Sequence, residues 1–164
     1  MITAQFIIDY SVFEQKMGGL GTKVIPYAKI QAQEIAKYGQ RMVKVFTLSG
    51  GTRTKGRQKI AELWALEQSR SAYTDIYTIR NLYPNQDVIH IFEEGAMAHQ
   101  ILPNKKRVLH WEDPDSGESI YATNVHHPGV PASHMMEKTV NALNPKIELW
   151  QTATFAMVDS VTRI

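Results

Sequence analysis

The sequence predicts a single α+β domain: a long N-terminal helix packed on a small, mainly antiparallel sheet, with helices at the C-terminal end. Three observations predict this fold. Residues 22–48 carry apolar and small side chains at helical spacing, several later segments have the composition of strands, and no linker or internal repeat divides the 164 residues. A chain of this length can bury a real core, and its 43% apolar content is typical of a folded protein.

The N-terminal third holds the long helix. Residues 2–8 are apolar and partly β-branched, which predicts a short strand or, over residues 1–10, an extended arm. Thr22 is a suitable N-cap for the helix, and Pro26 falls near its first turn, where a missing N–H does no harm. One face of the helix steps by three and four residues through small and apolar side chains, namely Ala28, Ala32, Ile35, Gly39, Met42 and Phe46. Small residues on this face predict the close approach of another element.

A basic segment follows the helix. Residues 49–58 predict a flexible loop, and residues 58–68 predict a helix after it. The basic side chains of this region are candidates for contacts with a nucleic-acid backbone that do not depend on sequence: Arg53, Lys55, Arg57 and Lys59. The glycine spacing of residues 51–56 is that of a phosphate-binding loop, but Arg57 and Gln58 stand where such a loop needs Lys and Ser or Thr. A nucleotide site is therefore not predicted.

The rest of the chain supplies the predicted sheet and the C-terminal helices. Residues 71–82 read as a strand, and residues 88–94 read as a short helix that ends at Gly95. Residues 107–111 and 119–125 predict two further strands of the sheet, paired around a polar turn at 113–117. Helices are expected over 134–143 and 146–164, separated at Asn144-Pro145. The side chains expected in the core of the sheet are Ile79, Leu109, Trp111, Ile120 and Val125.

Composition bounds the possible partners. No cysteine is present, so disulfide and thiolate chemistry are excluded. No run of 18 apolar residues occurs, so no membrane contact is expected, and the first ten residues make a poor secretion signal. Residues 1–60 carry a net charge of +7 and residues 61–164 a net charge of −5. This asymmetry indicates one face that meets a negative partner and another that meets a positive one, or simply solvated surface charge.

The histidines and acidic residues do not form a recognisable active site. His126 and His127 are adjacent, so in a strand they point to opposite sides and do not share a metal ion easily. No serine lies in a nucleophile elbow. We therefore expect no catalytic residue, no metal and no cofactor, and we expect His99 and His127 to satisfy carbonyls near turns. The alternative is a small metal-dependent hydrolase or nuclease that uses Glu93, His126 and His127.

An ordered pattern runs through the middle third of the chain, with glycine, proline, histidine and tryptophan at fixed places. Its members are Glu93, Gly95, His99, Ile101, Pro103, Leu109, Trp111, Gly117, Val125, His127, Pro128 and Gly129. The order and spacing of these residues resemble those of the tail-completion, or neck, proteins of long-tailed bacteriophages. These small proteins sit at the junction between head and tail.

The resemblance implies a structural virion protein and no enzyme. It implies a ring, with six copies expected and twelve as the alternative, made in the cytoplasm of the bacterial host. The implied partners are a head-completion or connector protein on one side and a tail terminator or tail tube protein on the other. Within such a ring, the basic residues Arg53, Lys55, Arg57 and Lys59 would face the lumen and contact the genomic DNA without reading its sequence. A tail-terminator-like ring protein is the other structural function considered.

Overall fold

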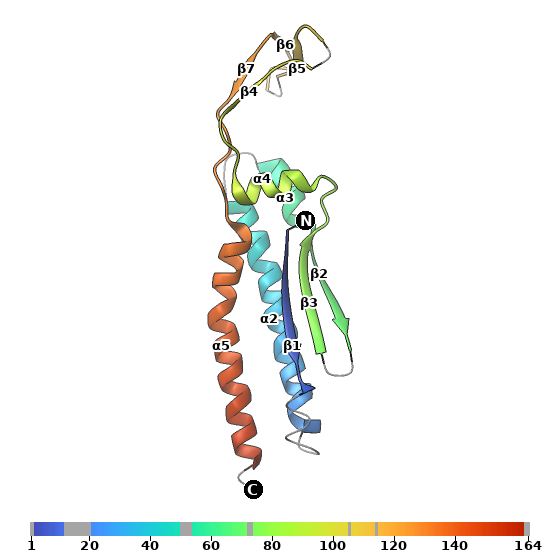
Figure 1. The fold of residues 1–164 in the computed structure, drawn as a ribbon, viewed down its shortest axis with the longest axis vertical. Helices are drawn as coiled ribbons and strands as arrows, with labels where there is room; N and C mark the ends of the chain where they lie inside the picture. Colours follow the sequence, from blue (N-terminus) through green and yellow to red (C-terminus); the bar gives the residue numbers. More distant parts are fainter. Residues whose placement is uncertain are drawn as a thin grey trace.

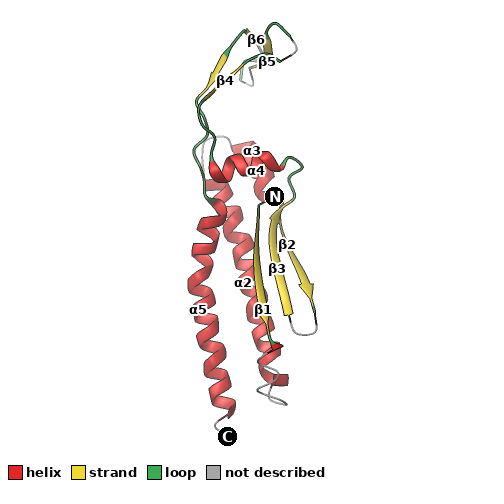
Figure 2. Ribbon diagram, in the orientation of Figure 1, coloured by secondary structure: helices red, strands yellow, loops and turns green. Residues whose placement is uncertain are grey.

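The computed structural model describes residues 2–11, 21–49, 54–71, 74–104, 106–113 and 115–162; of residues 21–23, 54–56 and 161–162 it describes the backbone alone. These segments form an elongated body. A narrow β-arm, residues 96–130, projects from one end of it (Figure 1). Two long helices and a three-stranded sheet run along the body, and two short helices cover the end next to the arm (Figure 2). The predicted α+β class is confirmed.

The sheet contains β1 (Thr3–Asp9), β3 (Thr74–Asn81) and β2 (Trp64–Arg70), all antiparallel, with β3 in the centre. Side chains alternate along β3, so that Tyr77 and Ile79 face the core. The predicted strand within residues 71–82 is confirmed. Of the two predictions for the N-terminus, the strand is right and the extended arm is wrong, because residues 3–9 pair with β3 along their whole length.

The prediction of a helix over residues 58–68 is wrong in its boundaries. The helix α3 spans Thr54–Glu62, and β2 begins at Trp64. Trp64 is fully buried, and its indole Nε1 donates a hydrogen bond of 2.8 Å to Thr47 Oγ1. Pairing with β3 and burial of this indole override the helical preference of the segment that follows. Residues 50–53 of the predicted loop lie outside the described residues, and from residue 54 onward the chain is helical.

The long helix α2 (Gly21–Ser49) packs against both the sheet and the C-terminal helix. Ala28, Ala32 and Ile35 on the predicted face are buried, and so is Ala36 beside them. A Cβ added at Gly39 would lie 2.9 Å from Ile79 Cδ1 and 3.0 Å from Leu143 Cδ1. Gly39 therefore sits where the helix, the sheet and the C-terminal helix come closest, which is the packing reason for a glycine inside a helix.

The C-terminal segment is one helix, α5 (Met135–Thr162), and the predicted break at Asn144-Pro145 is wrong. Proline at this position leaves the carbonyl of Asn141 without its helical partner. Asn141, Asn144 and Pro145 are all exposed, so that water can take the place of the missing N–H. Within the described segments, no helix is both long enough and apolar enough to cross a bilayer.

Helix α4 (Gln86–Glu94) confirms the predicted short helix next to the arm. Asn85 caps it, with its side chain accepting a 3.0 Å hydrogen bond from the backbone N–H of Asp87. The helix buries Ile89 and ends at Gly95, as predicted. The hydrophobic core beneath it joins α2, α3, β2, β3 and the start of α5, and no described residue between 97 and 129 takes part in it.

Candidate functional site: the β-arm and its joint to the body

We define the β-arm as residues 96–130. The chain leaves the body after α4, runs out along β4 (His99–Ile101) and β5 (Leu109–Glu112), and returns along β6 (Ser119–Ala122) and β7 (Val125–His127). β4 pairs with β7 near the body, and β5 pairs with β6 further out (Figure 1). The predicted hairpin is confirmed, but its strands do not join the main sheet. The prediction that these strands belong to the main sheet is therefore wrong, because they form separate two-stranded sheets in the arm.

The strands β5 and β6 and the turn between them form the outer hairpin of the arm. This outer hairpin has one apolar face. Leu109 lies opposite Ala122 and Trp111 lies opposite Ile120, so that all four side chains share this face. Trp111 is 39% exposed, and Leu109, Ile120 and Val125 are only partly buried. Of the five core residues predicted from the sequence, only Ile79 is buried in the body. The other four belong to the arm, where the described part of the chain provides no second layer.

The opposite face of the arm is polar and aromatic. His110 and Tyr121 stack across the outer hairpin with ring centroids 4.6 Å apart. Closer to the body, His99 and His127 stack at 5.1 Å, on the same face of β4 and β7 as Ile101 and Val125. At the hairpin turn the carboxylate of Asp113 accepts hydrogen bonds from the backbone N–H groups of Asp115 and Ser116, which lower the pKa of Asp113. The turn predicted at residues 113–117 is confirmed by these bonds.

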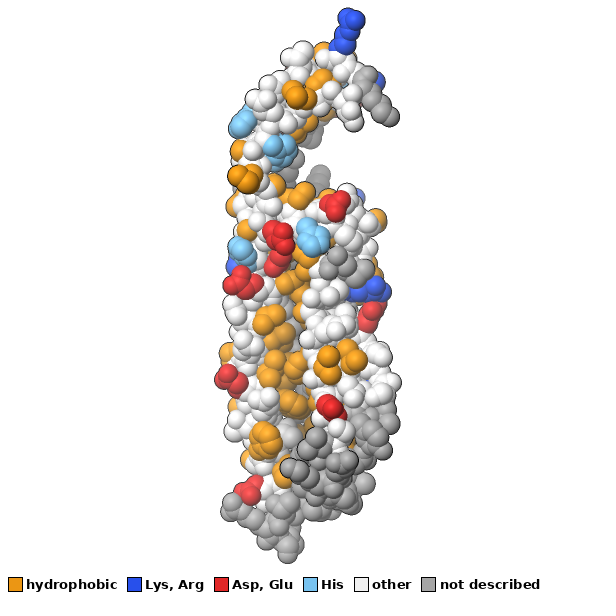
Figure 3. Space-filling model, in the orientation of Figure 1, with side chains coloured by type: hydrophobic (Ala, Val, Ile, Leu, Met, Phe, Trp, Pro, Cys, Tyr) orange, Lys and Arg blue, Asp and Glu red, His pale blue; other side chains and the backbone are white. Residues whose placement is uncertain are grey.

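The strand pairs of the β-arm are at best marginally stable through their own contacts. A two-stranded hairpin is marginal in water unless a further layer covers its apolar face. Large apolar side chains elsewhere on the arm are exposed as well, including Met97 at 89% and Leu102 at 62%. Figure 3 shows the arm as a thin curved extension that leaves a gap between itself and the body. An uncovered apolar ribbon of this kind is typical of a surface that docks on another molecule.

A joint of close backbone contacts fixes the arm to the body. Ala96 and Val130 exchange two backbone hydrogen bonds, of 2.8 and 2.9 Å, where the two sides of the arm meet. Gly95 and Gly129 flank this bridge with φ of +80° and +88°. A Cβ on Gly95 would lie 2.7 Å from the Val130 carbonyl oxygen, and one on Gly129 would lie 2.5 Å from the Ala96 carbonyl oxygen. Only glycine fits at either position.

The same joint holds the start of α5. Both oxygens of the Glu93 carboxylate accept from the backbone N–H of Met136, at 3.0 and 3.1 Å. The hydroxyl and the backbone N–H of Ser133 both donate to the carbonyl of Phe92. A carboxylate at the N-terminus of a helix satisfies an unpaired N–H and interacts favourably with the helix dipole. Glu93 therefore ties the end of α4 to the beginning of α5.

We predict that Glu93→Ala destabilises the protein by about 2 kcal/mol, because a charged hydrogen bond to a helix N-terminus is lost. Glu94→Ala is the matched control. Glu94 is exposed, its carboxylate lies 3.9 Å from His90 Nδ1, and its removal is expected to change stability by less than about 0.5 kcal/mol. Urea unfolding of both variants measures the difference. Equal losses for the two variants would contradict the capping role of Glu93.

Most residues of the pattern that runs from Glu93 to Gly129 lie in this joint or in the arm. His127 Nδ1 accepts a 3.1 Å hydrogen bond from the backbone N–H of Gly129, and His99 Nδ1 contacts the Met97 carbonyl oxygen at 3.0 Å. The expectation that both rings donate to buried carbonyls is wrong, because the contact of His99 is exposed and His127 accepts from an N–H. His126 points to the other face, opposite Gln100. Among the described residues, no group of three or more His, Asp or Glu side chains could hold a metal ion.

The predicted basic cluster does not hold together. Arg53 and the side chain of Lys55 lie outside the described residues. Arg57 is buried at 7% exposure: its guanidinium donates to the Thr47 carbonyl oxygen at 3.2 Å and lies 4.8 Å from the centroid of the Phe92 ring. Burial lowers the pKa of Arg57. The prediction that Arg57 faces a lumen is therefore wrong, while Lys59 is exposed on α3.

We predict that Arg57→Ala lowers the free energy of unfolding by about 2 kcal/mol, because it removes a buried hydrogen bond and the packing on Phe92. Lys59→Ala, two residues away on an exposed position, is expected to leave stability unchanged within about 0.5 kcal/mol. Thermal and urea unfolding of the two variants test this. If the Arg57→Ala protein is stable but binds DNA more weakly, the result would support a role of Arg57 in DNA contact.

Comparison with protein-family models, with curated proteins and with solved structures found no match to this chain.

Proposed function

We propose that this chain is a structural subunit of a bacteriophage neck, which joins head and tail by forming a ring between the head-completion complex and the tail tube. One observation carries the proposal: the β-arm projects from the body with an apolar face that nothing in the described part of the chain covers. The order of residues in the arm and its joint, which resembles that of neck proteins, supports the same reading.

The division of the molecule suits a ring subunit. The body has its own core, and none of the described residues between 97 and 129 contributes to that core. An arm built in this way can reach a neighbouring copy without disturbing the subunit that carries it. Such a contact joins two different surfaces of the subunit, and its repetition around an axis gives a ring where the rotation between copies closes. Six copies are proposed, with twelve as the alternative.

The proposed partners follow from this position. A head-completion or connector protein would meet one end of the ring, and a tail terminator or tail tube protein would meet the other. Contact with genomic DNA in the lumen would be non-specific and would rely on exposed basic side chains such as that of Lys59. The protein would reside in the virion at the head–tail junction.

The mass of the purified protein in solution tests the proposal, alone and mixed with candidate head-completion and tail proteins. Six copies of the 18.6 kDa chain give an assembly of about 112 kDa. We expect this mass for the protein alone, or this mass increased by that of the bound partner when a neck protein is added. A protein that remains a monomer at high concentration and binds neither class of partner contradicts the proposal.

A further inference from the structure

A long groove runs between α2 and α5 along the middle of the body. Its volume is about 510 Å³, and its walls are formed by α2 from Tyr27 to Arg41 and by α5 from Lys146 to Ala153. The wall residues of α2 recur every three or four positions, so that they share one face of the helix. We call this feature the interhelix groove.

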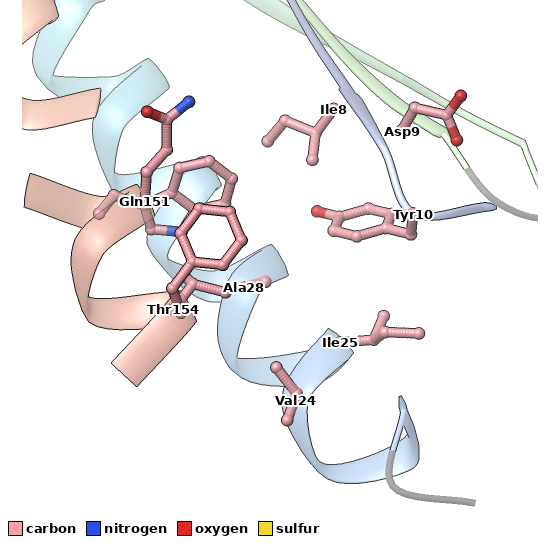
Figure 4. A pocket seen from close by; sticks show the side chains of 10 residues that line it. Ile8, Asp9, Tyr10, Val24, Ile25, Ala28, Gln151 and Thr154 are labelled. Atoms are coloured by element: carbon pink, nitrogen blue, oxygen red, sulfur yellow. The ribbon is translucent and has the colours of Figure 1, made fainter. Parts of the chain in front are cut away.

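The sheet covers this pair of helices on a different side. There α2 presents Ala28 and Ala32, and Ile8 and Tyr10, at the end of β1, point toward α2 and α5 (Figure 4). The interhelix groove has no such cover among the described residues, because it is lined by α2 and α5 alone. Leu149 in its wall is 65% exposed. An apolar wall that is left open in this way is available to another molecule.

The groove carries an excess of positive charge. Arg41 and Lys146 stand on opposite walls, and Lys146 Nζ lies 5.5 Å from the centroid of the Tyr38 ring. Glu34 is the only acidic residue among the described wall residues, and Lys37 already pairs with it at 2.8 Å. The other described charged residues of α2 are all basic. An occupant that combines negative charge with apolar side chains is therefore favoured.

The outer hairpin of the β-arm has this combination. Trp111 and Ile120 lie on its uncovered apolar face. No basic residue lies between positions 112 and 122, and acidic residues occupy the turn and flank it, namely Glu112, Asp113, Asp115 and Glu118. Lys106 and Arg107 precede β5, at the end of the hairpin away from the turn. The turn end of the hairpin thus carries the charge opposite to that of the groove.

The dimensions of hairpin and groove also match. The α2 wall from Tyr27 to Arg41 is about 21 Å long at 1.5 Å per residue. The four residues of β5 extend over about 14 Å, so the hairpin fits lengthwise with room for its turn. The phosphate backbone of DNA is the other acidic candidate, but a row of phosphates would leave the apolar wall at Leu149 and Ala153 uncovered. The hairpin is therefore the occupant that these observations favour.

The arm cannot enter the groove of its own chain. It points away from its own body, and the joint holds it at the end of the body next to α4 (Figure 1). The groove lies along the middle of α2 and α5. A neighbouring copy supplies an arm that can reach it. The charge asymmetry of the sequence, +7 for residues 1–60 and −5 for residues 61–164, is then a match between two copies.

We propose that the outer hairpin of the β-arm docks in the interhelix groove of a neighbouring copy. Trp111 and Ile120 cover the wall at Leu149, and the acidic turn lies between Arg41 and Lys146. This inference rests on the proposed function and identifies the contact between the copies of the ring. The contact joins two different surfaces, so it repeats from copy to copy and closes where the rotation between copies allows it.

Charge reversal tests the contact. A groove variant combines Arg41→Glu with Lys146→Glu, and an arm variant combines Glu112→Lys with Glu118→Lys; all four residues are exposed. A third protein carries all four substitutions. The concentration at which half of the chains are assembled is measured for each protein by sedimentation over a dilution series, under conditions in which the unchanged protein assembles.

We expect the groove variant and the arm variant each to raise this concentration about tenfold or more, because like charges then face each other across the contact. The protein with all four substitutions should return to within about threefold of the unchanged protein, because opposite charges face each other again. Lys44→Glu with Lys59→Glu is the matched control. It changes the net charge by the same amount as the groove variant, at positions outside the groove, and should leave assembly unchanged.

The other results separate the contact from the ring. Normal assembly of both the groove variant and the arm variant overturns the contact and leaves the proposed ring standing. Loss of assembly in both, without recovery in the protein with all four substitutions, also overturns the contact. A groove variant that assembles normally but has lost salt-dependent binding to duplex DNA assigns the groove to DNA and overturns the docking of the hairpin. An unchanged protein that stays a monomer, alone and with neck partners, overturns both the ring and the contact.

Discussion

Excision of the β-arm is expected to turn the assembly into a stable monomer. The variant replaces residues 97–129 by Asn-Gly between Ala96 and Val130. These two residues already exchange a pair of backbone hydrogen bonds, which is the arrangement that flanks a two-residue hairpin turn. Because the buried clusters of the body include no described residue of the excised segment, the body should keep its core. The apolar face that we propose as the docking surface is then gone.

Two measurements define the outcome. The mass in solution should fall from that of the assembly to that of one chain, and the melting temperature should change by no more than about 4 °C, which corresponds to roughly 1 kcal/mol. A full-length control keeps the chain length constant: Trp111→Ser with Ile120→Ser removes the apolar face and should also abolish assembly. Changing the polar face by His110→Ser should not. An excised protein that still assembles at full mass would show that the ring contacts lie on the body.

The sequence predicted the body better than the arm, and the reason is the range of the interactions involved. The face of α2 that includes Ala28, Ala32 and Gly39 is periodic over many residues, so it identified a helix and its packing face together. The composition of residues 71–82, rich in Tyr, Thr and Ile, and the glycine after α4 are also local signals, and both predictions are confirmed. These patterns depend only on the period of the backbone and on the side chains that lie next to each other along it.

Two of the wrong predictions, for the outer hairpin and for Arg57, depend on where a segment packs after its local structure has formed. The outer hairpin was recognised, but its apolar residues, such as Trp111, suggested a place in the main sheet, because a sequence cannot tell a face covered by its own chain from one covered by a partner. The sequence indicated that Arg57 is an exposed charge. Its burial depends on contacts with the Thr47 carbonyl and the Phe92 ring, which are distant in the sequence. Pro145 was read as a break, although an exposed helix position tolerates it.

The joint explains why glycines stand at both ends of the arm, and Gly95 provides the sharpest test. Its φ of +80° and ψ of 178° belong to a region that is essentially restricted to glycine, at a cost of about 1–3 kcal/mol for other residues. A methyl group there would also lie 2.7 Å from the Val130 carbonyl oxygen and 2.8 Å from the Ala132 nitrogen, both of them backbone atoms. Backbone atoms of a paired bridge cannot move aside as a side chain can. Backbone strain and steric overlap therefore both destabilise a variant with a larger residue at position 95.

Gly95→Ala is expected to lower the free energy of unfolding by about 3 kcal/mol, the sum of conformational strain and overpacking, and the melting temperature by roughly 6–12 °C. Gly117→Ala is the matched control: its φ is +73°, but an added Cβ would meet no atom within 4 Å. Gly117 lies at the tip of the arm, outside the body's core, so strain there is released by local opening of the hairpin. Urea unfolding of Gly117→Ala should therefore differ from that of the unchanged protein by less than about 1 kcal/mol. Equal losses at the two glycines would mean that arm and body unfold as one unit, in which case the arm could not serve as a separate docking element.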